Sequence, residues 1–333
     1  MQKVSVIVPN YNHARFLQQR IESILNQTYS DFDLLILDDM SPDNSREVIE
    51  RYRQNPRVRI EYNTANSGST YLQWKKGLSL TTSEYVWIAE SDDYADSDLL
   101  NCLVARLDAH PQAGLAVADS TIVDDNNNAL GIHGRDLKIS GPFGSYSLPP
   151  IRDNYVQLGR DYCRNYMVPW NTIPNASGVL FRRSALAAVG GPATELRLCG
   201  DWYTYCRILM QFDICREAKA LNYFRTHNSN VRSRTKTMLY MTEQRQVRSY
   251  VRHTIGCREP RRYVIPLLRY ECELLIRDER GPPSSKVPGR RLLAVLARAA
   301  RFGPLLFAYT AAVLLKEQVA RFIMAPIRNC LSE

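Results

Sequence analysis

Residues 85–93 read Tyr-Val-Trp-Ile-Ala-Glu-Ser-Asp-Asp, an apolar run followed at once by three carboxylates. The apolar part predicts a buried strand, so Glu90, Asp92 and Asp93 would stand together at its carboxyl end. Neighbouring carboxylates repel one another unless a cation compensates them. Carboxylate oxygens are the ligands that Mg²⁺ and Mn²⁺ prefer. A helix N-terminus, which favours acids, is the alternative; it accounts for Asp96 and Asp98 but not for Asp92 and Asp93.

Three further strands are predicted upstream of this stretch, with helices between them. The runs 4–8, 34–37 and 58–62 are rich in Val, Ile and Leu, and we expect Pro9 to close the first. Apolar residues at helical spacing follow from Phe16 to Leu25, and residues 69–80 are also predicted to be helical. Strands alternating with helices favour an α/β fold with a mostly parallel central sheet flanked by helices.

The predicted strand ends are unusually polar. They hold Pro9–Asn12, Asp38-Asp39, Asn63–Gly68 and Glu90–Asp93. In open α/β sheets, ligands bind beyond the carboxyl ends of the strands. Loops are often polar without function, and for Asp38-Asp39 alone that alternative is equally acceptable. For four strand ends on one edge, a binding site is the better interpretation.

Composition narrows the class of protein. The 333 residues are 45% hydrophobic and carry a formal charge of +9, which excludes a disordered chain or a disulfide mini-scaffold. The eight cysteines include no CxxC pair, and the first apolar run is too short for a signal peptide, so reduced thiols and a cytoplasmic location are expected. Residues 251–333 account for +8 of the charge. This suits an anionic membrane, nucleic acid or a solvated surface, although no nucleic-acid module pattern is present and no nucleic-acid partner is expected.

Three runs together resemble a family 2 glycosyltransferase of the GT-A fold: residues 4–12, 36–43 and 87–93. The resemblance is strong over residues 1–100 and continues to about residue 235 through shorter motifs. It implies a nucleotide-sugar donor, Mn²⁺ or Mg²⁺ as cofactor, and Glu90-Ser91-Asp92 at the position of the family's Asp-x-Asp metal motif. Because the first acid here is Glu, the metal contact is expected at Asp92 or Asp93.

The resemblance also implies roles for the other strand ends and for the later motifs. The expected donor-binding residues are Pro9, Tyr11, Asn12, Asp38, Asp39, Asn66, Gly68, Lys76, Asp92, Arg232 and Arg234. His227 is the expected third metal ligand, and a structural histidine is the alternative. For Lys76, a solvated helix face is an equally good alternative.

Asp201 is the expected catalytic base. It precedes a helix with apolar positions from Trp202 to Leu209, so it could instead be an N-cap. In the family, an acid before such a helix takes the proton of the acceptor hydroxyl. The aromatic and amide side chains around residues 155–184 suit sugar binding, and the expected acceptor contacts are Tyr166, Trp170, Asn175 and Trp202.

The predicted organisation is a catalytic domain at 1–235, with a nucleotide-binding half (1–100) and an acceptor-binding half (101–235). A basic helical region follows at 236–333. From Arg290 it is amphipathic, which suits a peripheral contact with the cytoplasmic membrane face or, alternatively, a hairpin packed on the domain or on a second subunit.

The predicted activity is metal-dependent, inverting transfer of a sugar from a UDP-sugar to a hydroxyl of a glycan or lipid-linked glycan, in bacterial surface-polysaccharide synthesis. Two alternatives remain open: sugar transfer to polyprenyl phosphate, and a non-catalytic membrane- or glycan-binding module.

Overall fold

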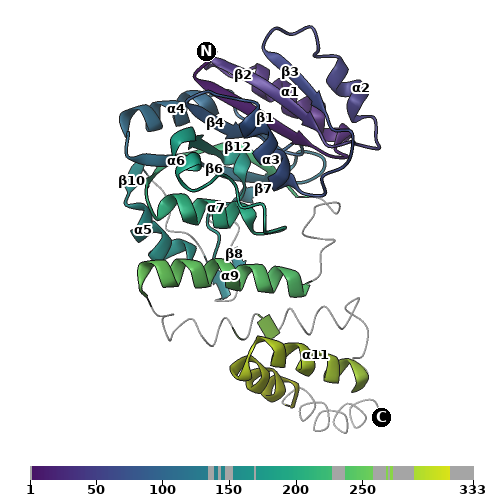
Figure 1. Cartoon of the computed structure of the whole chain (residues 1–333), viewed down its shortest axis with the longest axis vertical. Helices are drawn as coiled ribbons and strands as arrows, with labels where there is room; N and C mark the ends of the chain where they lie inside the picture. Colours follow the sequence, from purple (N-terminus) through teal and green to yellow (C-terminus); the bar gives the residue numbers. More distant parts are fainter. Residues whose placement is uncertain are drawn as a thin grey trace, which may run out of the picture. The chain divides into compact units, whose positions relative to one another are not determined.

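A computed structural model describes residues 2–133, 139–141, 144–146, 153–168, 170–226, 237–257, 268, 271–272 and 289–315 (Figure 1). The chain forms two compact units. The first comprises Met1–Ile139, Ser147–Arg234 and Glu243–Cys257, and the second comprises Ser140–Tyr146, Thr235–Thr242 and Arg258–Glu333. Each unit is described by itself below.

A ten-stranded sheet is the centre of the first unit. Its main order is β10-β12-β6-β11-β4-β1-β2-β3, with β5 beside β12 and β7 beside β6. The strands are β1 (Val4–Asn10), β2 (Phe32–Asp38), β3 (Val58–Tyr62), β4 (Tyr85–Ile88), β5 (Tyr94–Ala95), β6 (Ala113–Val123), β7 (Ala129–Ile132), β10 (Tyr155–Gln157), β11 (Val179–Arg182) and β12 (Asp213–Arg225).

Strands β1 to β4 pair in parallel, as do β6 and β12. Strand β11 is antiparallel to both of its neighbours, β4 and β6. The predicted α/β class with a mostly parallel central sheet flanked by helices is therefore confirmed. One detail differs from prediction: β1 does not stop before Pro9 but pairs with β2 through Asn10. Extended backbone at a strand end tolerates the fixed φ and missing N–H of proline.

Helices cover both faces of the sheet. They are α1 (Ala14–Leu25), α2 (Ser45–Glu50), α3 (Thr70–Ser79), α4 (Leu99–Ala109), α5 (Gly159–Tyr162), α6 (Arg183–Ala188) and α7 (Gly200–Leu209), with the short turns η1 (Cys163–Met167) and η2 (Ala176–Gly178). Figure 1 shows α1, α2 and α3 with β1 to β3 in the purple to dark blue part of the chain.

The two faces of β1 differ because side chains alternate along a strand. Val6 and Val8 share one buried cluster with Leu17 of α1 and with α4. On the other face, Gly77 of α3 lies against Ile7: a Cβ at Gly77 would be 2.5 Å from Ile7 Cγ2. Glycine therefore lets α3 lie directly on the sheet, and this close packing brings the first turns of α3 to the carboxyl ends of the strands.

The second unit is described in parts. They are a two-stranded sheet of β8 (Ile139–Gly141) and β9 (Gly144–Tyr146), the start of α9 (Thr237–Ile255), α11 (Gly289–Phe302) and a helix at 304–315. Its core holds Met241, Cys272, Val295, Ala299, Leu306 and Leu314. Within the described parts of both units, no helix has the length and apolar character needed to cross a bilayer.

Candidate functional site

The end of β2 is tied to the end of β1 by short hydrogen bonds. Asn10 and Asp38 are register partners, and Asn10 Nδ2 donates to Asp38 Oδ1 at 2.8 Å. Ser41 Oγ donates to the same oxygen at 2.6 Å, and Ser41 N donates to Oδ2 at 3.1 Å. Asp38 is thus a buried carboxylate whose oxygens accept from neutral groups of its own chain.

Asp39 is held by the loop between β3 and α3. Its carboxylate accepts hydrogen bonds from Asn63 Nδ2 at 2.5 Å, from Ser67 N at 2.9 Å and Oγ at 2.7 Å, and from Gln73 Nε2 at 3.0 Å. Asn66 Nδ2 donates to the backbone oxygen of Asp39 at 2.8 Å. These bonds fix the loop that contains the predicted donor residues Asn66 and Gly68.

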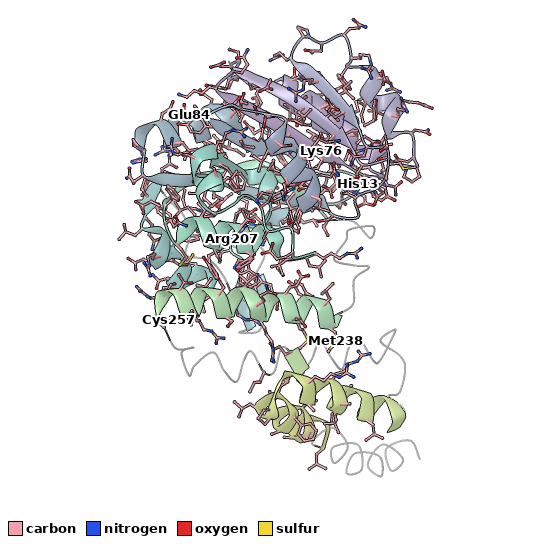
Figure 2. All side chains as sticks on the ribbon, in the orientation of Figure 1. His13, Lys76, Glu84, Arg207, Met238 and Cys257 are labelled. Carbon is pink, nitrogen blue, oxygen red and sulfur yellow. The ribbon has the colours of Figure 1, made fainter. Side chains whose placement is uncertain are left out.

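Two further residues, Gly68 within the same loop and Lys76 on α3, contribute to its conformation. Gly68 has φ +71°, a left-handed conformation that favours glycine. Its N–H donates to Asn66 Oδ1 at 2.8 Å. Lys76, on α3, donates to Asn63 Oδ1. Figure 2 labels Lys76 and His13, which both lie in the first unit.

The loop after β1 is the exposed part of the predicted donor site. Pro9 is buried within β1, while Tyr11 has 48% of its surface exposed. Asn12 has φ +61°, and its N–H donates to Ser41 Oγ at 3.0 Å. Ser41 therefore joins the β1–α1 loop to Asp38.

Glu90 lies at the carboxyl end of β4 and faces α3. Its carboxylate accepts from Trp74 Nε1 at 2.8 Å and from Thr70 Oγ1 at 3.4 Å. Burial, and then the charge of Asp92, raise the pKa of Glu90 to about 8. Near neutral pH this carboxyl therefore holds a proton for much of the time.

Asp93 is more deeply enclosed than Glu90. Its Oδ2 accepts from Asn175 Nδ2 and Ser177 Oγ, each at 2.6 Å, and its Oδ1 accepts from Arg225 N at 2.9 Å. Burial, and then the charge of Asp92, raise its pKa to about 7. Asp92 is the more accessible member, since Asp93 is buried and Asp92 only partly so.

Two arginines near this group were not predicted from the sequence. Arg225, at the end of β12, donates from Nε to the backbone oxygen of Asp92 at 2.8 Å, and its guanidinium lies 4.5 Å from the ring centre of Phe16. Arg20 is fully buried on α1, 4.9 Å from the ring centre of Trp87. Burial lowers its pKa to about 10, and the charges of Asp93, Asp92 and Glu90 oppose that shift. The carboxylate group is thus next to two arginines, Arg20 and Arg225.

Asp201 lies in the first turn of α7 and is buried. Its Oδ1 accepts from Trp202 N at 2.7 Å and from Tyr71 Oη at 3.4 Å, and its Oδ2 accepts from Asn171 Nδ2 at 3.5 Å. The N-cap position is Cys199, and no side chain makes a capping bond there. The Asp201 carboxylate is therefore not the helix N-cap, although it does lie near the positive end of the helix dipole.

Helix α3 connects Glu90 with Asp201. Tyr71 and Trp74 are three residues apart on one helix face, and their rings meet edge to face at 5.2 Å. The Tyr71 hydroxyl donates to Asp201, and Trp74 Nε1 donates to Glu90. The sequence signal was the aromatic pair at i, i+3 spacing, but its partners lie 16 and 130 residues away in the chain.

Gly200 makes room for this arrangement. A Cβ there would lie 2.6 Å from Tyr71 Cε2 and 2.7 Å from the backbone oxygen of Ala193. Neither distance is tolerable for a real side chain. The glycine before Asp201 is therefore a packing requirement of the site.

The predicted acceptor residues fall into two groups. Tyr166 and Trp170 are partly exposed, whereas Asn175 and Trp202 are buried. Asn175 donates to Asp93, and Trp202 Nε1 donates to the backbone oxygen of Met167 at 3.1 Å. The exposed pair can meet a ligand directly; the buried pair supports the segments around it.

Three predicted residues, His227, Arg232 and Arg234, lie outside the described residues. Within the described ranges, no group of three His, Cys, Asp or Glu side chains is arranged to hold a metal ion. Of the three acids after β4, Glu90 and Asp92 are partly exposed and Asp93 is buried.

Sequence comparison identifies the family. The sequence profile described as Glycosyl transferase family 2 matches residues 5–186, more than half of the chain. The chain belongs to glycosyl transferase family 2.

Individual relatives agree with this assignment. The uncharacterized glycosyltransferase alr2836 of Nostoc sp. is 29% identical over 231 residues, which cover 68% of this chain and 66% of that protein. The poly(ribitol-phosphate) beta-N-acetylglucosaminyltransferase TarP of Staphylococcus aureus is 40% identical over 97 residues, 28% of this chain and 29% of TarP. The matched stretches thus span less than two thirds of these relatives.

Solved structures show the same fold. S. aureus TarS 1–349 in complex with UDP-GlcNAc has a TM-score of 0.57 at 18% identity, over 93% of this chain and 87% of that one. The mannosyltransferase PcManGT of Pyrobaculum calidifontis, in complex with GDP-Man and Mn²⁺, has a TM-score of 0.52 at 18% identity, over 96% and 81%. At such identities the likeness concerns the GT-A fold alone.

Proposed function

We propose that this protein transfers a sugar from a UDP-sugar to a hydroxyl group of a glycan or lipid-linked glycan, with inversion at the anomeric carbon and Asp201 as general base. The observation that carries the proposal is the placement of the Asp201 carboxylate. It is buried, oriented by Tyr71 and Asn171, and joined through α3 to Glu90 at the end of β4. An acid held at a fixed place beside the strand-end carboxylates is what a single displacement needs.

The donor is assigned to the edge formed by β1, β2 and α3. Asp38 and Asp39 hold the loops that carry Tyr11, Asn12, Asn66 and Gly68, and Tyr11 offers an exposed aromatic side chain for a nucleotide. UDP is favoured as the nucleotide because TarS, whose fold is similar, was solved with UDP and with UDP-GlcNAc. A hydroxyl-bearing polymer is favoured as acceptor because TarS and TarP are named as N-acetylglucosaminyltransferases of poly(ribitol-phosphate), and chondroitin synthase is named for a polysaccharide product.

The residues present fit a divalent cation shared with a diphosphate. Mg²⁺ commonly takes only one or two carboxylates, with substrate phosphates and water completing its shell. Asp92 would hold the ion, with Glu90 as the second candidate, while Asp93 positions Asp92 through the hydrogen bonds that enclose it. Such an ion neutralises the charge that develops on a diphosphate leaving group. His227, Arg232 and Arg234 stay in the proposal as further ligands of the ion and the diphosphate.

The transfer itself requires only one displacement. The acceptor oxygen attacks the anomeric carbon, the bond from that carbon to the diphosphate oxygen breaks with its electron pair leaving on the diphosphate, and Asp201 takes the hydroxyl proton. Tyr166 and Trp170 offer partly exposed rings against which the acceptor sugar can stack. Asn175 and Trp202 support the site without being exposed: Asn175 donates to Asp93, and Trp202 donates to the backbone oxygen of Met167.

Transfer to polyprenyl phosphate is the rival activity. A phosphate acceptor is already an anion and needs no general base. The buried, oriented carboxylate of Asp201 favours a hydroxyl acceptor instead. Burying a carboxylate is unfavourable, and transfer to a phosphate would not require one at this position.

The test is a calorimetric titration of the protein with UDP, GDP and dTDP, each with Mn²⁺ and with EDTA. We expect UDP to bind with Mn²⁺ and this binding to disappear in Asp92→Ala/Asp93→Ala. Binding of another nucleotide would reassign the donor. No binding of any nucleotide with metal present would reject the transferase proposal and leave a non-catalytic binding module.

A further inference from the structure

The helix at 304–315 has two apolar sides, of which only one is covered. Residues 302–315 contain no charged side chain. Leu306, Thr310 and Leu314 recur every four residues and are buried in the core of the second unit. On the opposite side of the helix, Leu305, Ala308, Ala312 and Leu315 are exposed, and Leu305 and Leu315 expose 68% and 63% of their surface.

The neighbouring helix α11 repeats this pattern. Val295 and Ala299 are buried in the same core, while Leu293, Ala297 and Ala300 share the opposite side and are exposed. Leu293 exposes 68% of its surface. We call the exposed residues of these two helices the tail face: Leu293, Ala297, Ala300, Leu305, Phe307, Ala308, Ala312 and Leu315.

The charges around the tail face have one sign. Residues 289–315 contain four arginines, at 290, 291, 298 and 301, and no Asp or Glu. Arg301 is exposed beside Ala297 and Ala300 on α11. An uncharged surface of leucine and alanine side chains with the exposed Arg301 beside it is complementary to a bilayer with anionic headgroups, because the leucines enter the apolar boundary and the guanidinium group meets phosphates.

We propose that the tail face docks on an anionic lipid bilayer, with α11 and the helix at 304–315 lying in the plane of the headgroups. A second copy of the chain is a poorer occupant, because the contact would bring Arg301 of each copy together with no acid in residues 289–315 of either copy to compensate the two charges. Lying on the surface also agrees with the length of these helices, since none in the described parts could cross a bilayer.

Docking would hold the proposed transferase at the bilayer that carries a lipid-linked acceptor. This benefit of docking rests on the proposed function. The docking itself requires neither donor nor acceptor. It can therefore be measured on the protein without nucleotide, and its failure leaves the nucleotide titration unaffected.

The experiment is co-sedimentation of the full chain with vesicles of phosphatidylglycerol and phosphatidylcholine in equal parts, against vesicles of phosphatidylcholine alone. We expect binding to the anionic vesicles, weakened by salt. Leu305→Glu/Leu315→Glu should reduce the partition coefficient by roughly tenfold or more. The matched control is Leu130→Glu/Leu158→Glu, which adds the same charge at leucines of the first unit that expose 49% and 63% of their surface; it should bind like wild type.

Arg301→Glu provides a second test that leaves every leucine in place, and thermal melts by circular dichroism check that each variant is folded. Absence of binding to anionic vesicles, or equal losses in the tail and control variants, would overturn the proposal. A dimer in light scattering that Leu305→Glu/Leu315→Glu converts to monomer, without vesicle binding by wild type, would assign the tail face to a second copy.

Discussion

Two pairs of adjacent aspartates end strands of the same sheet, and their surroundings differ. Asp38 and Asp39, after β2, accept hydrogen bonds from amides, hydroxyls and backbone N–H groups. Asp92 and Asp93, after β4, stand beside a third acid, Glu90, and burial together with mutual repulsion raises the pKa values of Glu90 and Asp93.

The difference separates two uses of a carboxylate at a strand end. Neutral donors around Asp38 and Asp39 stabilise their charge, and the same hydrogen bonds hold the loops beside them. The acids after β4 interact with Arg20, with Arg225 and with the hydrogen-bond donors of Asp93, and the pKa values of Glu90 and Asp93 are nevertheless raised. A cation would stabilise the charged forms of such a group. The predictions below test this division.

The largest effect is expected at Asp201, which α3 joins to the group after β4. Asp201→Asn removes the proton acceptor but keeps the shape, so kcat should fall by about a thousandfold while UDP affinity is unchanged. The control is Asp213→Asn, a partly buried aspartate that bonds Gly159 N; its kcat should stay near wild type. Activity retained in Asp201→Asn would favour a phosphate acceptor.

Asp39→Ala tests the structural side of the comparison. It leaves the donors at Ser67, Asn63 and Gln73 without their acceptor, and we expect the free energy of unfolding to fall by about 3 kcal/mol. Urea denaturation measures it. Asp31→Ala, at an exposed aspartate just before β2, is the control and should change stability by less than about 0.5 kcal/mol. If Asp39→Ala were as mild as the control, its hydrogen bonds would not be what holds the β3–α3 loop.

Asp92→Asn tests whether the acids after β4 bind a cation. We expect Mn²⁺-dependent UDP affinity to fall by roughly a hundredfold, with little change in EDTA and little loss of stability. Asp96→Asn is the control in the segment that follows, because the Asp96 carboxylate accepts a hydrogen bond from Asp98 N at 2.9 Å, which an Asn side chain can also accept. Calorimetry separates the two variants; equal affinities would remove Asp92 from the metal site.

The acids after β4 should also make stability depend on pH. The folded-state pKa values, about 8 for Glu90 and about 7 for Asp93, lie above those of an unfolded chain. The folded protein therefore keeps protons that the unfolded chain has already released. In EDTA, stability should be highest below about pH 4 as far as these groups are concerned, and should fall as pH rises from there to about 8.

Urea denaturation of wild type and Glu90→Gln, in EDTA and in Mg²⁺, measures this dependence. Gln at position 90 carries no titratable proton, so its loss between the two pH values should be smaller than that of wild type. Excess Mg²⁺ should also reduce the loss, because a ligand that binds only the folded state stabilises it. A pH dependence identical in wild type and Glu90→Gln would contradict the raised pKa of Glu90.

The first four strands could be predicted from the sequence because each is a local apolar run. The predicted runs 4–8, 34–37, 58–62 and 85–89 correspond to β1 to β4. The insertion of β11 between β4 and β6, antiparallel to both, was not predicted. Strand order and direction there depend on contacts between distant segments, which a local pattern does not encode.

The candidate site was also predictable only in part. Residue types and motif spacing were enough to nominate Asp92, Asp93 and Asp201. The residues that hold them, such as Arg225 and Ser177, lie 132 and 84 positions from Asp93 in the chain. A buried arginine or serine has no local signature, because its role is set by what the fold brings against it.

The smallest effect is expected at Tyr71, and it decides how far α3 couples the two acids. The bond from Tyr71 to Asp201 is long, 3.4 Å, whereas that from Trp74 to Glu90 is 2.8 Å. Tyr71→Phe should therefore lower kcat by only about threefold and leave the nucleotide Kd unchanged. Trp74→Phe removes a donor from Glu90 and should act on metal-dependent nucleotide binding instead.

If each variant changed both kcat and nucleotide affinity, α3 would couple Glu90 and Asp201 rigidly. If each variant changed only one of the two quantities, the two acids would act independently. Steady-state kinetics with UDP titrations distinguishes the two results.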